Sequence, residues 1–103
     1  MPKLQIKKRT TWVEMPEEYE GFQVEVWVNA PARLWNDILA GSGAQVEDAL
    51  RQVIVAHNEW CDFDGEPYPQ PDTVEFWQDI PTELAAVIIS KAREATYALP
   101  NSL

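Results

Sequence analysis

The sequence has very little of several residues on which common functions depend. Its 103 residues include one cysteine, Cys61, one histidine, His57, and four glycines. A single cysteine cannot close an internal disulfide, so nothing indicates an oxidising compartment. One cysteine and one histidine also fall short of the four ligands of a structural zinc site. The glycines do not form the pattern G-x-x-x-x-G-K-[ST], which excludes a phosphate-binding loop of that type.

Long apolar runs are absent as well. No stretch approaches the roughly 20 apolar residues that a membrane-spanning helix needs. The basic start, residues 1–9, has no apolar segment behind it and is therefore not typical of a signal peptide. We expect a cytoplasmic protein that does not enter a membrane.

Basic residues are scarce beyond the first nine positions. The formal net charge is −9, and half of the 8 basic residues are Lys3, Lys7, Lys8 and Arg9. The rest of the chain has 4 basic and 17 acidic residues, a balance of −13. Such a body repels phosphate backbones, so we expect it to bind no nucleic acid. An acidic surface suits a basic patch on a protein partner, and it equally serves solubility alone.

The patterning predicts a single α+β domain over residues 1–103. Residues 1–29 are mainly strands, and helical periodicity begins after them. Two strands alone are marginally stable in water. We therefore expect an N-terminal antiparallel strand pair packed against three to four helices.

The two predicted strands differ in clarity. The stretch 22–28 alternates strictly, with Phe22 and the valines on one face and Trp27 on the other. A weaker alternation begins at Leu4 and Ile6 and continues through 10–13. We predict that these two stretches pair.

Residues 30–58 have the spacing of two helices. The first begins near Pro31 and presents one apolar stripe, formed by Leu34, Trp35, Ile38 and Leu39. The second starts at a capping box on Ser42, and its apolar positions recur as far as His57.

The last third of the chain combines a loop with two helices. Residues 59–72 predict a proline-rich loop. Residues 73–98 predict a short helix, a break before Pro81 and a C-terminal helix.

His57, Cys61 and Asp62 lie close together in the sequence and invite a catalytic or metal-binding interpretation. No third group is placed to orient the histidine, so a packed or capping histidine is the favoured interpretation. The turn at 62–65 lacks the ligand spacing of a calcium loop and is interpreted as a tight acidic turn. We predict a protein without enzymatic activity, catalytic residues, metal ligands or cofactor.

The five tryptophans are the strongest candidates for function. Trp35 belongs to the helix stripe and is predicted to be core. Trp60 and Trp77 flank the proline-rich loop and would clamp it. Trp12 and Trp27 would form an exposed apolar patch if they lie on the open face of the strand pair, and such a patch indicates a protein partner. All four outside the core are named as candidate partner-binding residues, and an exposed strand edge leaves a homo-oligomer open.

The second half of the chain resembles a known layout. It contains VIVAHNEW at 53–60, DFDGEPYP at 62–69, VEFW at 74–77 and IPTEL at 80–84. A helix that ends on tryptophan, an acidic turn with prolines and a final helix opened by proline follow in that order. Over residues 21–96 this resembles the small tail assembly chaperones and tail-morphogenesis proteins of long-tailed bacteriophages.

The resemblance implies a function for the chain. Members of this family bind the long helical tape-measure protein, keep it soluble and help tail-tube subunits assemble around it. The chain would then be encoded by a phage or prophage, act in the host bacterial cytoplasm, and be the short form where a frameshifted longer form exists. Two alternatives stay open: another acidic interaction protein (an inhibitor, antitoxin-like or DNA-mimicking protein), and a small enzyme whose site the sequence does not reveal.

Overall fold

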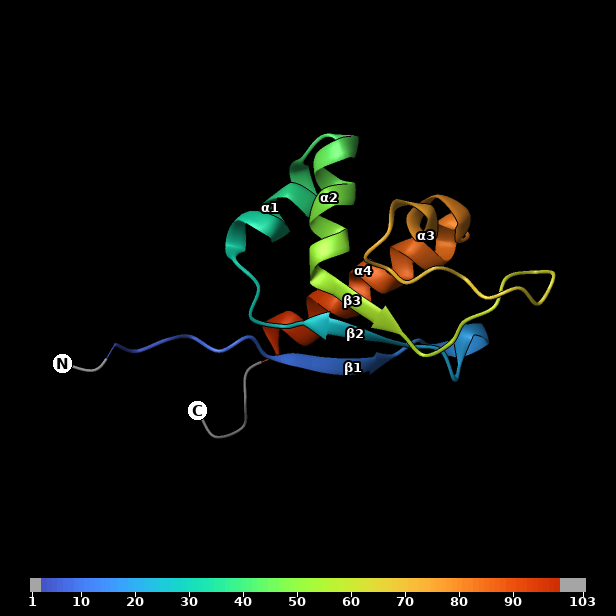
Figure 1. The fold of residues 1–103 in the computed structure, drawn as a ribbon, viewed down its shortest axis with the longest axis horizontal. Coiled ribbons are helices and arrows are strands. Elements are labelled where there is room, and N and C mark those ends of the chain that lie inside the picture. The colour runs from blue at the N-terminus through green and yellow to red at the C-terminus, as the bar shows by residue number, and fades with distance from the viewer. Residues whose placement is uncertain (1–2, 99–103) are drawn as a thin grey trace.

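The computed structural model describes residues 3–98 as one sheet with helices around it (Figure 1). The strands lie in the order β1-β2-β3, and both pairings are antiparallel. This confirms the predicted α+β class and the N-terminal strand pair. The elements in chain order are β1 (Thr10–Glu14), the 3-10 helix η1 (Glu17–Tyr19), β2 (Gln23–Trp27), α1 (Ala32–Ala40), α2 (Gly43–Val53), β3 (Ile54–His57), α3 (Val74–Asp79) and α4 (Thr82–Tyr97).

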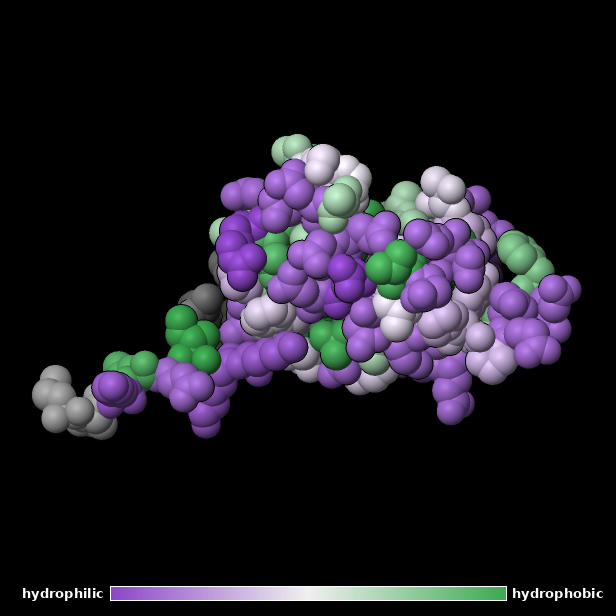
Figure 2. Space-filling view, turned by 45° about the horizontal axis from the view of Figure 1, so that its top comes forward, coloured by the Kyte–Doolittle hydropathy of each residue, from purple (hydrophilic) through white to green (hydrophobic). Residues whose placement is uncertain are grey.

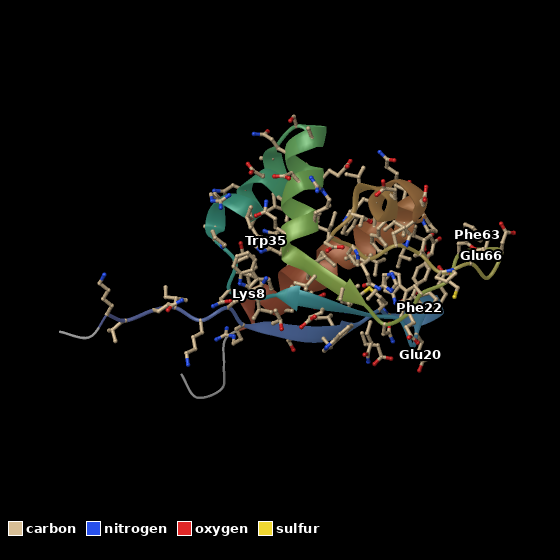
Figure 3. The ribbon with its side chains drawn as sticks, in the orientation of Figure 1. Lys8, Glu20, Phe22, Trp35, Phe63 and Glu66 are labelled. Atoms are coloured by element: carbon tan, nitrogen blue, oxygen red, sulfur yellow. The ribbon has the colours of Figure 1, made fainter. Side chains whose placement is uncertain are left out.

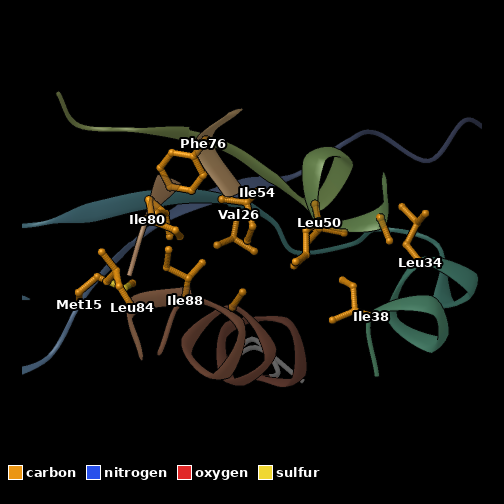
Figure 4. Packing of buried hydrophobic residues seen from close by; sticks show 14 of the residues in the cluster. Met15, Val26, Leu34, Ile38, Leu50, Ile54, Phe76, Ile80, Leu84 and Ile88 are labelled. Atoms are coloured by element: carbon orange, nitrogen blue, oxygen red, sulfur yellow. The ribbon is translucent and has the colours of Figure 1, made fainter. Parts of the chain in front are cut away.

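Helix α4 covers one face of the sheet, behind the strands in Figure 1. Its buried residues Leu84, Ile88 and Ala92 recur at helical spacing. They meet the face of β2 that carries Val24 and Val26, which are both 0% exposed. Helices α1 and α2 form a hairpin that closes the core beside β3 (Figure 4). The strict alternation of β2 thus gives the sheet one buried face.

Most of the predicted α1 stripe is in the core. Leu34, Trp35 and Ile38 are buried, as expected. Leu39 is 49% exposed, so its assignment to the stripe was wrong. Leu39 lies at the edge of the apolar stripe of α1. The contact of α1 with the core is too narrow to bury this side chain.

The strand predicted to start at Leu4 and Ile6 begins later. Both side chains are almost fully exposed, at 98% and 87%, and β1 begins at Thr10. Asn29 extends the contact with the segment before β1 only a little. Its Nδ2 donates to the Lys7 carbonyl, and its Oδ1 accepts from the Arg9 N–H. Because β2 ends at Trp27, residues 3–6 have no neighbouring strand to pair with.

The second predicted helix ends early. It starts at the expected capping box, where the Ser42 N–H donates to Gln45 Oε1 at 2.9 Å. It then stops at Val53, and residues 54–57 form β3 instead of continuing to His57 as a helix. β-branched residues at 53–55 favour a strand, and β2 offers a free edge for them to pair with. The predicted strand pair is therefore a three-stranded sheet.

Gly41 at the end of α1 provides a test of local packing. A Cβ at this position would lie 2.5 Å from the Asp37 carbonyl oxygen, which belongs to the backbone and cannot turn away. We expect Gly41→Ala to lower the free energy of unfolding by about 1–3 kcal/mol, measured by urea denaturation. Gly43→Ala is the matched control, since a Cβ there meets nothing within 4 Å. An alanine in the first turn of α2 should change stability by no more than about 0.5 kcal/mol, or raise it. Equal effects at the two positions would contradict this reading of Gly41.

Candidate functional site

The candidate site is the face of the sheet that α4 does not cover. The pairing of β1 with β2 puts Thr10 opposite Trp27, Trp12 opposite Glu25, and Glu14 opposite Gln23. Directly opposed residues share a face, so these six side chains all point away from the buried valines. We call this group the open sheet face. Within residues 3–98, no helix crosses in front of it (Figure 1).

Trp12 is the exposed tryptophan of this face. Its side chain is 48% exposed, although it is large and apolar. Beside Trp12, Thr10 Oγ1 on β1 donates a hydrogen bond to Glu25 Oε2 on β2 at 2.7 Å. The sequence-based placement of Trp12 and Trp27 on one open face is therefore what the register gives.

Trp27 lies on the same face, partly buried against the core. The Lys8 Nζ sits 4.6 Å from the centre of its ring, which is a cation–π distance. Its indole Nε1 is buried and has no hydrogen-bond partner within the described residues. Trp27 thus offers a partner only the accessible part of its apolar ring, because its Nε1 is buried.

A cavity of about 340 Å³ adjoins Trp27. It is lined by Lys8, Trp27, Arg51, Gln52, Val55 and Asp72. Arg51 binds Asp48 through a terminal nitrogen at 2.9 Å, while its buried Nε has no partner within residues 3–98. Donor groups predominate over the single carboxylate of Asp72. A carbonyl or carboxylate of a bound chain is the kind of group that this cavity suits.

The structure removes Trp60 from the candidate partner-binding residues. Its side chain is 1% exposed, so it has no surface to offer a partner in this fold. It stacks on Phe22 and His57 at ring distances of 5.1 and 5.3 Å, and it lies tilted against Phe76 at 5.9 Å. Its Nε1 donates to Asn58 Oδ1 at 2.8 Å. Trp60 is a core residue that fixes the start of the loop.

Trp77 clamps the other end of the loop. Its Nε1 donates to the Pro71 carbonyl at 2.7 Å, and its ring packs edge-on against Phe76. It is partly buried and lies on α3. Among the four named tryptophans, the open sheet face therefore brings together only Trp12 and Trp27.

His57 is a packed residue, as its position in the sequence indicated. It is 5% exposed. Its Nδ1 accepts from the Trp60 N–H at 3.1 Å, and its Nε2 lies 2.9 Å from the Pro69 carbonyl oxygen. Because a carbonyl only accepts, Nε2 carries the hydrogen. Both ring nitrogens are used in fixing the backbone on either side of the loop.

Residues 62–66 form the predicted acidic turn. Asp62 Oδ1 accepts from the N–H groups of Asp64 and Glu66, both at 2.9 Å. Gly65 has φ +81°, a conformation that glycine adopts without strain. In the part of the chain that the structure describes, no three His, Cys, Asp or Glu side chains are grouped to hold a metal ion.

Sequence reasoning missed a second surface, at the end of the molecule where η1 meets the loop. A hollow of about 190 Å³ is lined there by Tyr19, Phe22, Cys61, Asp62, Phe63, Tyr68, Pro81 and Leu84. We call it the end cleft. Phe63 at the tip of the loop is 88% exposed. The one sequence signal was this phenylalanine between two aspartates, because the cleft joins segments that are about 40 residues apart.

Carboxylates surround the end cleft. A hydrogen bond to the Glu83 carboxyl, with the charge of Glu83, raises the pKa of Glu18. Burial, followed by the charges of Glu83 and Glu18, raises the pKa of Tyr19. Burial, followed by the charges of Asp62 and Asp79, raises the pKa of Tyr68. The negative potential therefore reaches both sides of the cleft.

Glu18 gives a prediction on pH. Its pKa is raised in the folded state, so the folded protein binds this proton more tightly than the unfolded chain. The contribution of Glu18 to stability is therefore present below its ordinary pKa of 4.5 and is lost as pH rises through the raised pKa. We expect Glu18→Gln to reduce this loss, measured as urea midpoints from acidic to neutral pH. Glu14→Gln, on the open sheet face, is the control for the loss of one carboxylate. Parallel profiles for wild type and Glu18→Gln would contradict the prediction.

No protein-family model, curated protein or solved structure matches this chain. Among the described residues, no helix has the length and apolar character needed to cross a membrane.

Proposed function

We propose that this chain is a non-enzymatic protein-binding module that binds a helical client on the open sheet face. The observation that carries the proposal is the pair of tryptophans on that face, of which Trp12 is 48% exposed. Exposed apolar surface of this kind is typical of sites that bind other proteins, and tryptophan is enriched in binding hot spots.

The exposed tryptophan is unusual for the outer face of this sheet. Helix α4 packs on the buried face. An antiparallel sheet commonly has helices on one face and leaves the other, polar face to solvent. A client helix lying on the open sheet face would bury Trp12.

The polar groups around the tryptophans specify the client further. Glu14 and Glu25 are on the open sheet face beside Trp12, so basic residues would suit the edges of the client's apolar stripe. The cavity at Trp27 has the exposed donors Lys8 and Gln52 in its lining and suits a client carbonyl or carboxylate. The proposed client is therefore an amphipathic helix with charged groups beside its apolar stripe.

The resemblance to tail assembly chaperones supplies the proposed identity of the client. A tape-measure protein is long and helical, and its apolar stripes need cover until tail-tube subunits enclose it. The chaperone's own net charge of −9 would help to keep such a complex dispersed in the cytoplasm.

Co-expression with the tape-measure protein of the same gene cluster tests the proposal. We expect the two proteins to co-purify and the tape-measure protein to stay soluble, measured by affinity capture followed by size-exclusion chromatography with light scattering. Failure to associate, with precipitation of the tape-measure protein, would overturn the chaperone assignment.

Trp12→Ala tests the binding surface itself. A tryptophan hot spot contributes about 2 kcal/mol or more, so we expect the affinity for the client to fall by about 30-fold or more. Leu39→Ala is the matched control, because Leu39 on α1 is equally exposed, at 49%, but lies off the open sheet face. Unchanged affinity in Trp12→Ala, or an equal loss in both variants, would exclude this face.

A further inference from the structure

Residues 3–7 form an arm that extends from the body. Leu4 and Ile6 are 98% and 87% exposed. The segment runs away from the sheet at one end of the molecule (Figure 1) and stands clear of the body in the space-filling view (Figure 2). Neighbouring exposed apolar side chains are typical of an interaction surface.

The arm combines apolar and basic groups. Leu4 and Ile6 alternate with the exposed residues Lys3, Gln5 and Lys7. In an extended chain, residues two apart point to the same side. The arm therefore has Leu4 and Ile6 on one side and Lys3 and Lys7 on the other, and the long lysine side chains can reach around its edges. A matching partner surface is apolar where Leu4 and Ile6 face it and acidic around that area.

The end cleft has this character and lies at the opposite end of the molecule. Phe22, Phe63 and Glu20 mark that end in Figure 3, far from the arm along the longest dimension of 56 Å. The lining of the cleft is mainly aromatic and aliphatic. A lysine ammonium gains from aromatic faces as well as from carboxylates.

Within the described residues, no basic side chain pairs with the carboxylates at the cleft. The ion pairs within residues 3–98 are Arg51 with Asp48 and Lys91 with Glu94, and neither is at the cleft. Glu18 and Glu83 face each other there, and Asp62 and Asp79 lie beside Tyr68. Bringing two lysines to this end would relieve like-charge repulsion.

We infer that the arm, residues 3–7, of one copy binds in the end cleft of a second copy, so that copies associate head to tail. Leu4 and Ile6 cover the aromatic lining, and Lys3 and Lys7 lie against the surrounding carboxylates. The same molecule cannot make this contact, because arm and cleft lie at opposite ends. The contact joins two different surfaces, so one copy can bind a second copy through its arm and a third through its cleft, and larger assemblies form as concentration rises.

This association is independent of the proposed client site. The arm and the end cleft use none of the six residues of the open sheet face. A row of copies would keep each Trp12 accessible. The buried area is small, so the association is weak and weakens further with salt.

Sedimentation velocity on the full chain tests the inference. Between about 10 µM and about 1 mM protein, we expect the average mass to rise with concentration at low salt and to fall towards monomer at about 0.5 M NaCl. Leu4→Asp with Ile6→Asp disables the arm, and Phe63→Ser with Glu18→Lys disables the cleft. Each variant should stay monomeric. Leu39→Asp is the control for a lost exposed leucine and should associate like wild type.

Mixing the two disabled variants gives the decisive result. The arm variant keeps an intact cleft and the cleft variant keeps an intact arm, so the mixture should form a dimer that stops at one copy of each. Circular dichroism spectra equal to wild type verify that both variants are folded. Wild type that is monomeric at about 1 mM overturns the inference. So does a mixture that stays monomeric, which would mean that the arm binds a different surface.

Discussion

Replacement of Trp60 by alanine should lower the free energy of unfolding by about 3–5 kcal/mol, which is a large share of the stability of a domain of this size. Trp60 is 1% exposed and is among the largest fully buried side chains. Its ring stacks on Phe22 and His57 and lies tilted against Phe76. Alanine would leave a cavity that these rings cannot fill without losing their own stacking.

Urea denaturation followed by far-UV circular dichroism measures this effect. Trp12→Ala is the matched control, because it removes the same side chain from a half-exposed position. We expect the control to lose no more than about 1 kcal/mol. If the two variants lose similar amounts, the assignment of Trp60 to the core and Trp12 to the surface is wrong.

Replacement of His57 by phenylalanine should cost about 2–4 kcal/mol, even though the ring remains. Phenylalanine keeps the stacking on Trp60 and Phe76, which lie 5.3 and 5.5 Å away. It cannot accept from the Trp60 N–H or donate to the Pro69 carbonyl. Each buried backbone group that loses its partner costs about 1–3 kcal/mol.

The same unfolding measurement tests His57→Phe, with Cys61→Ser as the control. Cys61 is exposed and lies in the same loop, so serine there should change stability by less than about 0.5 kcal/mol. A loss below about 1 kcal/mol in His57→Phe would mean that water satisfies the two backbone groups. The histidine would then contribute through its ring alone.

The two predictions together address how the proline-rich loop is held. His57 and Trp60 hold its start, the Trp77 Nε1 holds the Pro71 carbonyl, and a backbone hydrogen bond joins Tyr68 N–H to the Trp60 carbonyl. The loop in turn carries Phe63 and Tyr68 to the end cleft. Loss of either core residue should therefore also weaken the head-to-tail association, while Trp12→Ala should leave it intact.

The candidate site was only partly predictable. The alternation of 22–28 put Trp27 on the polar side of β2, and that depends on the local chain alone. The pairing of Trp12 with the same face followed once β1 and β2 were paired antiparallel. The position of Arg51 and Gln52 beside Trp27 could not be predicted from the sequence. These two residues at the end of α2 lie next to Trp27 only because residues 54–57 form a strand that pairs with β2.

The sequence by itself determined what depends on neighbours along the chain. The α+β class, the buried face of β2, the capping box at Ser42 and the break before Pro81 all follow from periodicity and from residues that end helices. The scarcity of basic residues determined the charge of the body in the same direct way.

Tertiary structure decided what depends on neighbours across space. Residues 54–57 have a helical apolar spacing, but the free edge of β2 made them a strand. Trp12 and Trp60 are the same residue type, and only their surroundings left one 48% exposed and the other 1% exposed. Leu4 and Ile6 alternate like a strand, yet no strand lies beside them. Burial and strand pairing each depend on two surfaces that meet, and one segment of sequence specifies only one of these two surfaces.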